Sequence, residues 1–429
     1  MTEATAPAAV DRRRLGGILL PLEGRDFRLY WLGQSVSLVG DGIYLVTVAW
    51  QVYALSNSPT ALAIVGISET VPLLVFVLVG GALADRLDRR KLLMVGAAIP
   101  GAAVSILAGL AAGGRLELWH VWAISAAVGL GRSIFGPASG AFVPQLVAPE
   151  LLVQANSLGQ VVRPLAMTLA GPALGGLLVG TFGFATAFAV DAGSFVFAVA
   201  TLLGISSRPR PRRDVRTGLL ADLREGFSYV RTQTWIWGTL LMATVWVLLV
   251  LGPFDVLVPF VVKNDLGGGA GTLGLVYAAG GVGAITAALV TGQLGLPRRP
   301  VTWMILGWAA GCASLAGVGL ARASWHAAIA LVVCEALITF GEIVWITLLQ
   351  TLVPGALLGR VRSVDWLLSV GLVPISFALT GPVAGVLGAR EVLVGASLLA
   401  GVLAAATLLL PGMRAPEASG SGASTSRPA

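Results

Sequence analysis

The stretch Gly81-Ala82-Leu83-Ala84-Asp85-Arg86-Leu87-Asp88-Arg89-Arg90-Lys91 places two acidic and four basic residues between two long apolar segments. An isolated charge in the hydrocarbon of a membrane is costly, so this cluster must lie where water meets the membrane. We therefore expect the stretch to be a loop between two membrane-spanning helices. A charged loop of this kind often does no more than set the topology of a membrane protein.

The composition of the chain agrees with this expectation. Of its 429 residues, 56% are apolar and only 11% are charged, and the mean hydropathy is +0.87. These values exclude a soluble globular protein. The length allows about twelve spans of ~20–25 residues with short loops between them. The composition therefore predicts an all-α polytopic membrane protein with twelve transmembrane helices.

Hydrophobic runs, read against charges and Gly/Pro breaks, predict two groups of six spans. The first group covers 27–55, 60–84, 91–112, 118–143, 152–181 and 184–206. The second group covers 235–262, 270–293, 301–321, 325–350, 362–388 and 391–411. No cleavable signal sequence is expected, because Pro21 and Glu23 break the short apolar run after Arg14.

These runs divide the chain into five parts. We expect a cytoplasmic N-terminal segment (1–26), a six-helix bundle (27–206), a cytoplasmic linker (207–234), a second six-helix bundle (235–411) and a disordered tail (412–429). The linker begins with the basic stretch Ser207–Arg213 and continues into an amphipathic helix. That helix either lies on the inner membrane surface or is simply solvated. Its apolar face consists of Leu219, Leu220, Leu223, Phe227 and Val230.

The distribution of Lys and Arg predicts the orientation. Seven arginines lie between residues 208 and 231, whereas the opposite loops hold only Arg115, Lys263, Arg322 and Arg390. We therefore expect a multi-pass protein of the cell membrane with both termini in the cytoplasm. The net charge of +7 then reflects topology and possible contact with anionic lipids, not a nucleic-acid site.

Two motifs resemble those of major facilitator superfamily transporters. Gly-x-Leu-x-Asp-Arg-x-x-Arg-Arg at Gly81–Arg90 resembles the loop between helices 2 and 3 of that family. Gly171-Pro172-x-x-Gly175-Gly176 resembles the end of the antiporter motif of its drug exporters, although the upstream glycines of that motif are missing. The segment that starts at Phe27 looks like the subgroup of enterobactin exporters and macrolide efflux pumps. Proline-containing segments also recur weakly in the second half, as expected for a parallel repeat.

The resemblance implies roles for both motifs. The substrate site would lie between the bundles, near the middle of the membrane. The loop residues Gly81, Asp85, Arg86, Arg89 and Arg90 would form a conformational latch, with Asp85 meeting the N-terminus of span 11 near Arg362–Val364. Gly171, Pro172, Gly175 and Gly176 would form a bendable, tightly packed region, or serve only in helix packing.

Charged and polar residues inside the spans indicate a cavity. Gln34, Asp41 and Tyr44 recur at helical spacing in the first span, and such a stripe would be expensive against lipid. Aromatic residues at helical spacing suit a large ligand, but they serve in packing more often. We expect the cavity and substrate contacts to comprise Gln34, Tyr44, Arg132, Phe135, Trp246, Glu335, Glu342 and Trp345.

Asp41 and Glu69 are the candidate proton-coupling residues. A carboxyl group removed from water among apolar helices binds a proton more readily, so it can load and release protons near neutral pH. The approach of Arg132 would favour release, so movement of this arginine could couple helix rocking to proton transfer. Asp191 in the sixth span is a further buried acid, or it is hydrated near the outer end of that span.

We therefore expect an exporter that moves an amphipathic organic compound of the drug, macrolide or siderophore class by alternating access. Proton antiport is the expected driving reaction, and we expect a monomer with no cofactor and no metal. The alternatives are a nutrient importer or uniporter of the same fold, or a non-transporting membrane sensor. An enzyme is not expected, because His120, His326, Cys312 and Cys334 form no catalytic or metal cluster.

Overall fold

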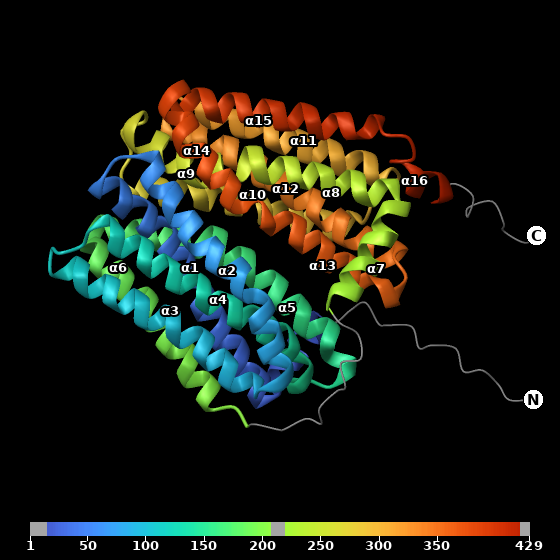
Figure 1. Cartoon of the computed structure of the whole chain (residues 1–429), viewed down its shortest axis with the longest axis horizontal. Coiled ribbons are helices and arrows are strands. Elements are labelled where there is room, and N and C mark those ends of the chain that lie inside the picture. The colour runs from blue at the N-terminus through green and yellow to red at the C-terminus, as the bar shows by residue number, and fades with distance from the viewer. Residues whose placement is uncertain (1–14, 207–218, 421–429) are drawn as a thin grey trace, which may run out of the picture.

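The computed structural model describes residues 15–206 and 219–420 of the chain. Every regular element in these ranges is a helix. Figure 1 shows two layers of helices, the first half of the chain in blue and green and the second half in yellow and red. The prediction of an all-α polytopic membrane protein is confirmed.

The first bundle follows a short 3-10 helix, η1 (Leu15–Glu23), and ends before the linker. Its fourth connection, between α4 and α5, carries a further short turn, η2 (Pro149–Leu151). Its fifth span consists of α5, a π-helical segment η3 and the start of α6. The long helices are α1 (Arg25–Leu55), α2 (Pro59–Arg86), α3 (Arg89–Ala112), α4 (Leu118–Leu146), α5 (Leu152–Pro164), η3 (Leu165–Ala170) and α6 (Gly171–Leu203).

The second bundle is built in the same way, with a π-helical segment η4 in its first span. A short 3-10 turn, η5 (Thr407–Leu409), follows its last long helix. The helices are α8 (Thr234–Trp246), η4 (Val247–Leu251), α9 (Gly252–Asn264), α10 (Ala270–Leu294), α11 (Pro300–Gly319), α12 (Ser324–Leu352), α13 (Gly355–Gly371), α14 (Val373–Leu387) and α15 (Ala389–Ala406).

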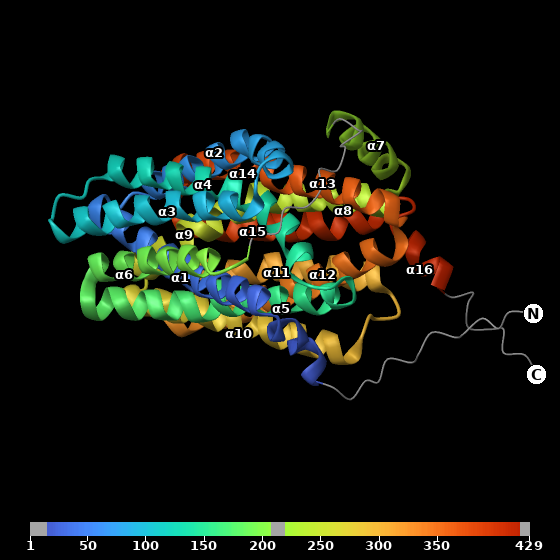
Figure 2. The ribbon, with the colours of Figure 1, turned by 90° about the horizontal axis from the view of Figure 1, so that it is seen from below.

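The bundles meet through a symmetric pair of contacts. The second span of the first half, α2, packs against α14 in the fifth span of the second half. In return α10, the second span of the second half, packs against α6. Figure 2 shows both pairs side by side, from a direction perpendicular to that of Figure 1. This reciprocity is what a parallel repeat of two six-span halves requires.

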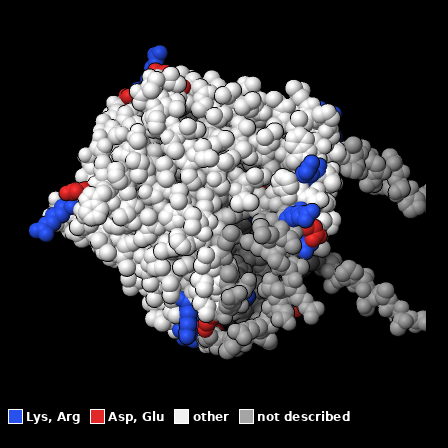
Figure 3. Space-filling model, viewed as in Figure 1, with Lys and Arg blue, Asp and Glu red and all other residues white. Residues whose placement is uncertain are grey.

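Eleven helical segments in the described ranges are long and apolar enough to cross a membrane, and each overlaps one predicted span. The remaining predicted span, 118–143, coincides with α4, a 29-residue helix packed against α2 and α3. Figure 3 shows the charged side chains gathered at the ends of the helices, with an uncharged surface between them. That uncharged belt is the surface that lipid would cover.

Each π-helical segment stands directly before a Gly-Pro pair. η3 precedes Gly171-Pro172 and η4 precedes Gly252-Pro253. Proline has no N–H to donate to the preceding turn, and a π-helical turn accommodates this loss. At η4 the hydroxyl of Ser376 donates to the carbonyl of Leu248 (3.0 Å) and accepts from the N–H of Gly252 (3.0 Å). Ser376 of α14 thus provides hydrogen-bond partners for two backbone groups of the interrupted helix.

The fifth and sixth spans are joined by a single glycine. Gly183 has φ +82° and ψ 175°, a conformation that glycine adopts without steric cost. The apolar runs on either side of it therefore stand as separate spans, 154–182 and 184–203. The predicted break at this point is confirmed.

The linker helix α7 (Leu219–Thr232) packs against α13. Glu225 forms an ion pair with Arg360 of α13 (2.6 Å), and Val230 is buried. The helix therefore rests partly on protein, which neither predicted setting included. The basic stretch Ser207–Arg213 lies outside the described residues.

The tail departs from its prediction. Disorder was predicted from residue 412, but α16 (Ala415–Gly420) is helical. Its Glu417 carboxylate accepts a hydrogen bond from the backbone N–H of Thr302 (2.7 Å) and another from the hydroxyl of Thr302 (3.0 Å) at the start of α11. The favourable position of a carboxylate at a helix N-terminus explains the contact.

Candidate functional site

Three spans of the first bundle bring together one base and two acids. The Nη2 atom of Arg132 on α4 lies 3.0 Å from Oδ1 of Asp41 on α1. Its Nη1 atom forms a second ion pair with Oε1 of Glu69 on α2. The close approach of α4 to α2 depends on Gly129, because a Cβ there would lie 1.9 Å from the carbonyl oxygen of Glu69. One guanidinium therefore serves two carboxylates, each largely removed from water (17% and 21% exposed side chains).

This ion cluster lines a cavity of about 250 Å³ between the two bundles. Met167 of η3, Thr70 of α2 and several apolar residues of α1 and α2 also line it on the side of the first bundle. The second bundle contributes Leu251, Asp255, Tyr277, Val373 and Phe377. Four predicted site residues, Asp41, Tyr44, Glu69 and Arg132, are thus brought to one cavity.

Tyr44 is held rigidly beside the ion cluster. Its hydroxyl shares a hydrogen bond with Oγ of Ser125 on α4 (3.0 Å). Its ring packs against Phe188 of α6 with centroids 6.2 Å apart. The side chain is buried, so this wall of the cavity keeps its shape.

Two ionisable residues of the cavity, Asp255 and Tyr277, were not among the predicted site residues. Asp255 lies seven residues before the end of the predicted span 235–262. The structure places it in the same cavity as Asp41 and Glu69. Tyr277 was missed altogether, and its ring packs against Phe254 at 5.8 Å. The sequence signal for Tyr277 was a single tyrosine in a span otherwise rich in glycine and alanine.

Three aromatic residues predicted to contact substrate do not line this cavity in the described conformation. Phe135 packs into the α3–α4 interface against Gly96. Trp345 packs inside the second bundle against Trp235 (5.7 Å between centroids). Trp246, at the end of α8, packs on the core, and its buried Nε1 has no partner among the described residues. Helical spacing cannot distinguish a cavity face from a packing face.

The remaining predicted polar residues do not line the central cavity. Gln34 is half-buried, about two turns along α1 from Asp41. Glu335 is half-buried and packs against Gly280 of α10, within electrostatic reach of Asp255. Glu342 is exposed, two turns further along α12. One end of the molecule carries α7, α16 and the start of α1, and we call it the linker end. Gln34 and Glu342 lie toward this end.

The two bundles are tied together at the opposite end, which we call the distal end and which carries the Ser56–Ser58 connection. The ammonium group of Lys263 on α9 donates to the backbone carbonyl of Tyr53 and to Oδ1 of Asn57 (3.2 Å). The Tyr53 hydroxyl in turn donates to the carbonyl of Val256. Further along, a Cβ on Gly381 of α14 would lie 2.6 Å from Cα of Thr60 on α2. These contacts close the cavity at the distal end.

Toward the linker end the molecule is more open. The ribbons of α5 and α13 diverge there in Figure 1. The exposed Glu342 lies in the same half of its helix.

The glycines of the predicted antiporter motif pack at the junction of both bundles. A Cβ on Gly171 would lie 2.6 Å from Cα of Gly42 on α1. A Cβ on Gly176 would lie 3.0 Å from Cα of Gly274 on α10, across the bundle interface. Gly175 approaches the backbone of Ile43 in the same way. The partner glycines at 42 and 274 carried no motif and were missed.

The charged loop at the linker end is engaged within the first bundle. Arg90 donates from Nε to the carbonyl of Leu202 and from Nη2 to that of Leu203, each at 2.7 Å. It thereby satisfies free carbonyls at the end of α6. Asp88 accepts from the N–H of Arg90 (2.9 Å) and caps α3.

The predicted partner of this loop needs correction. The structure starts α13 at Gly355, so Arg362–Val364 lie inside that helix, with their amides already bonded along it. The free amides belong to the first turn after Pro354. Gly81 has open space around it, whereas the side chains of Asp85 and Arg86 lie outside the described part of the structure.

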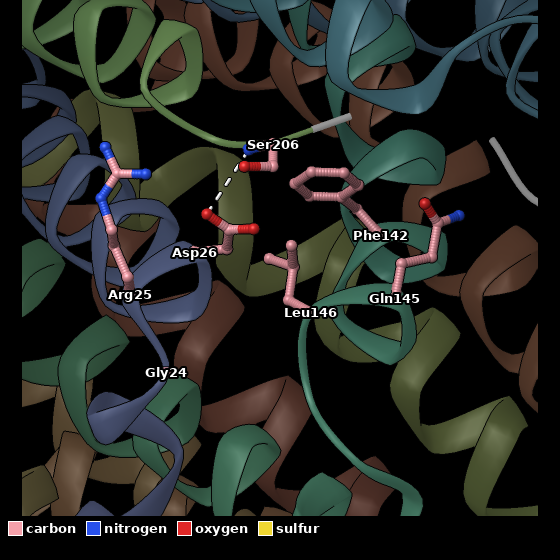
Figure 4. Close-up of a pocket in the computed structure, with 7 residues that line it drawn as sticks. All are labelled: Gly24, Arg25, Asp26, Phe142, Gln145, Leu146 and Ser206. Carbon is pink, nitrogen blue, oxygen red and sulfur yellow. Dashed lines mark hydrogen bonds between the residues drawn. The ribbon is translucent and has the colours of Figure 1, made fainter. Parts of the chain in front are cut away.

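A second pocket, of about 310 Å³, lies at the linker end of the first bundle. Figure 4 shows it between Asp26 at the start of α1, Phe142 near the end of α4 and Ser206 after α6. The backbone N–H of Ser206 donates to Oδ1 of Asp26 (3.4 Å). Among the described residues that line it, only Arg25 and Asp26 are charged, and both lie in the first turn of α1.

The comparisons with known proteins agree with the geometry. A family model described as transmembrane secretion effector matches residues 17–427. The enterobactin exporter EntS of Citrobacter koseri is 29% identical over 340 residues, covering 79% of this chain and 80% of the relative. The MFS-type transporter YfiS of Bacillus subtilis is 26% identical over 358 residues, covering 79% of this chain and 82% of the relative.

Solved structures share the fold at low identity. A bacterial homologue of the iron transporter ferroportin, in an inward-facing state, superposes with a TM-score of 0.66 at 18% identity, covering 90% of this chain and 98% of that chain. A POT family transporter superposes with a TM-score of 0.69 at 13% identity, covering 92% and 97%. The chain thus has the fold of these transporters.

Proposed function

Because the chain belongs to the transmembrane secretion effector family of major facilitator transporters, we propose that it exports an amphipathic organic compound by proton antiport. The observation that carries this proposal is the cavity between the bundles, with Asp41, Glu69 and Arg132 in its wall. Ionisable residues inside a membrane are expensive and are found where ions or substrates move.

The ion cluster suits proton coupling because the guanidinium is shared. A proton on Asp41 or Glu69 would remove one of the two attractions that hold Arg132. The arginine would then shift toward the remaining carboxylate and move α4 relative to α1 and α2. Protonation and helix rocking thereby influence each other, as a coupled transporter requires.

We assign the linker end to the cytoplasm, with both termini on that side, because Arg and Lys concentrate there. The distal contacts of Lys263 and Gly381 then close the outer side, and the conformation faces inward. In the opposite conformation Asp85 would meet the first turn of α13 and act as the latch. In both conformations α7 lies at the inner membrane surface, where its basic residues would contact anionic lipid. The protein functions as a monomer.

The orientation can be tested by cysteine labelling. Ser56 at the distal end and Ser228 on α7 are both exposed. A membrane-impermeant thiol reagent added to intact cells should label Ser56→Cys and leave Ser228→Cys unlabelled until the cells are opened. Equal labelling of both variants in intact cells would contradict the assignment.

The substrate is best sought among the compounds that relatives handle. The EntS relatives are named for enterobactin export, so a siderophore is the first substrate to test, followed by a macrolide and a cationic dye. Inverted membrane vesicles with an acidic lumen should accumulate the substrate, and an uncoupler should release it. Accumulation only in right-side-out vesicles would show import and would overturn the proposal.

A further inference from the structure

Asp191, in the middle of the sixth span, is the most deeply buried acid recorded in the described ranges. Only 1% of its surface is exposed. Its Oδ2 atom has no hydrogen-bond partner among the described residues. Its Oδ1 atom lies 3.5 Å from Oγ of Ser194, at the limit of a hydrogen bond. Leaving a carboxylate ionised here, with one oxygen unsatisfied, would cost several kcal/mol.

The backbone of α1 presses directly on this carboxyl group. A Cβ on Gly40 would lie 2.5 Å from Oδ1 of Asp191 and 2.1 Å from Oγ of Ser194. Gly40 precedes Asp41 in the chain, so the buried acid stands behind the ion cluster that lines the cavity. A larger residue at position 40 would push Asp191 away from α1 and from the ion cluster.

The charged groups that face Asp191 are few. They are Asp41 and Tyr44 from α1 and Arg132 from α4. Helix α3 also packs on α6, but its ionisable residues Arg89, Arg90 and Lys91 all lie in its first turn. Helix α10 carries only Tyr277, which lines the cavity. Among the described residues, the one cation that acts on Asp191 is Arg132, and it is already bonded to Asp41 and Glu69.

We propose that Asp191 stores the transported proton behind the ion cluster, and that Asp41 and Glu69 control its release by holding or freeing Arg132. In the conformation described here Asp191 is a neutral carboxylic acid, because its only possible counter-ion is engaged elsewhere. When substrate enters the cavity and displaces Arg132 from Asp41 and Glu69, the guanidinium turns to Asp191. The O–H bond of Asp191 then breaks, and its proton leaves through the cavity to the water at the linker end.

The return step restores the balance. In the opposite conformation the cavity opens at the distal end, the substrate leaves, and Arg132 returns to Asp41 and Glu69. The Asp191 carboxylate, again without a counter-ion, takes one proton from the water on that side. One proton thus enters for each substrate exported. The coupling half of this proposal rests on the proposed antiport, whereas the protonation of Asp191 does not.

Infrared spectroscopy of the purified protein tests the protonation directly. The carbonyl stretch of a buried, neutral carboxylic acid should appear in the wild type at pH 7, and Asp191→Asn should remove one component of it. Ser194→Ala, the matched control, should shift that component without removing it. An unchanged carbonyl region in Asp191→Asn would overturn the proposal, whether or not a substrate is known.

Transport tests the coupling. Asp191→Asn should keep substrate exchange without a gradient within about twofold of the wild type, yet lose accumulation driven by a proton gradient. If this variant does not fold, Asp191→Glu should retain both the infrared band, shifted, and gradient-driven accumulation. Full gradient-driven accumulation by Asp191→Asn would assign the proton to another residue.

Discussion

The two bundles hold their cavity carboxylates in opposite ways. In the first bundle, Asp41 and Glu69 both bond to Arg132. In the second bundle, Asp255 lines the same cavity, yet it forms no ion pair with any described residue. Both halves are six-span bundles, and the two kinds of carboxylate differ in the side chains that surround them.

This difference suggests a division of labour. A carboxylate that already has a counter-ion changes its bonding when a proton arrives, and so suits a switch. A carboxylate without one can accept a positively charged ligand, with Tyr277 and Phe377 beside it as aromatic surface. We propose that the first bundle couples protons and the second bundle recognises substrate.

The largest effect should follow the loss of Arg132. Arg132→Ala leaves two carboxylates without a counter-ion, and we expect gradient-driven transport to fall about a hundredfold, equivalent to ~3 kcal/mol for an unpaired buried charge. Arg132→Lys, the matched control, keeps the charge but cannot bond to both acids. Its gradient-driven transport should fall less than that of Arg132→Ala. Uptake into inverted vesicles measures both. If both variants took up substrate at nearly the wild-type rate, the first bundle would not couple protons through Arg132.

The next effect should come from Asp41. Asp41→Asn keeps the shape of the side chain but removes one attraction on Arg132, worth ~1.5–3 kcal/mol for a hydrogen bond between charged groups. We expect gradient-driven uptake to fall at least about tenfold, with the protein still folded and still able to exchange substrate. Normal sensitivity of uptake to the proton gradient in this variant would place coupling elsewhere.

Asp255→Asn should alter binding and leave coupling intact. For a cationic substrate we expect KM to rise about tenfold, the usual loss for one charge-assisted hydrogen bond, while a neutral substrate is unaffected. The number of protons moved per substrate should stay the same. Loss of coupling in this variant would show that the second bundle shares the switch.

A smaller effect is expected at the distal contacts. Lys263→Met removes the bonds to Tyr53 and Asn57 and should shift the population toward the opposite conformation by about two- to fivefold. Distances between spin labels on Ser56 and on Asn264 would report it. The control Lys263→Arg should keep the wild-type distance between the labels. An unchanged distance distribution in Lys263→Met would show that this contact does not help to close the distal end.

The smallest effect is expected at Trp345, which lies away from the cavity. Trp345→Phe removes its long hydrogen bond to Asp365 (3.4 Å) and should cost less than about 1 kcal/mol of stability. The range of transported compounds should not change. A changed substrate range, measured against a panel of dyes and macrolides, would show that Trp345 contributes to substrate binding.

The sequence predicted the fold well because membrane constraints are strong. Apolar runs of about twenty residues, broken at Gly183 and at the linker, follow directly from the thickness of the bilayer. The ion cluster was predictable in part, because Asp41, Glu69 and Arg132 stand alone in apolar spans. Their pairing required the angles at which α1, α2 and α4 cross, which no local pattern encodes.

Other features of the site could not be read from local patterns. Phe135 and Trp345 recur at helical spacing, but the packing face and the cavity face of a helix look alike in sequence. The place of Asp255 in the cavity depends on how α9 packs against α14 and α2, which no local pattern encodes. The start of α13 was placed too late, since its polar first turns resemble a loop.

Proton release on substrate binding tests the central claim most directly. Purified wild-type protein in weakly buffered solution near pH 7 should release about one proton for each substrate molecule bound, because binding and proton affinity must influence each other reciprocally. Asp41→Asn should release none, whereas Asp255→Asn should release the same number once saturated. Substrate binding without proton release in the wild type, or equal release in wild type and Asp41→Asn, would contradict the account.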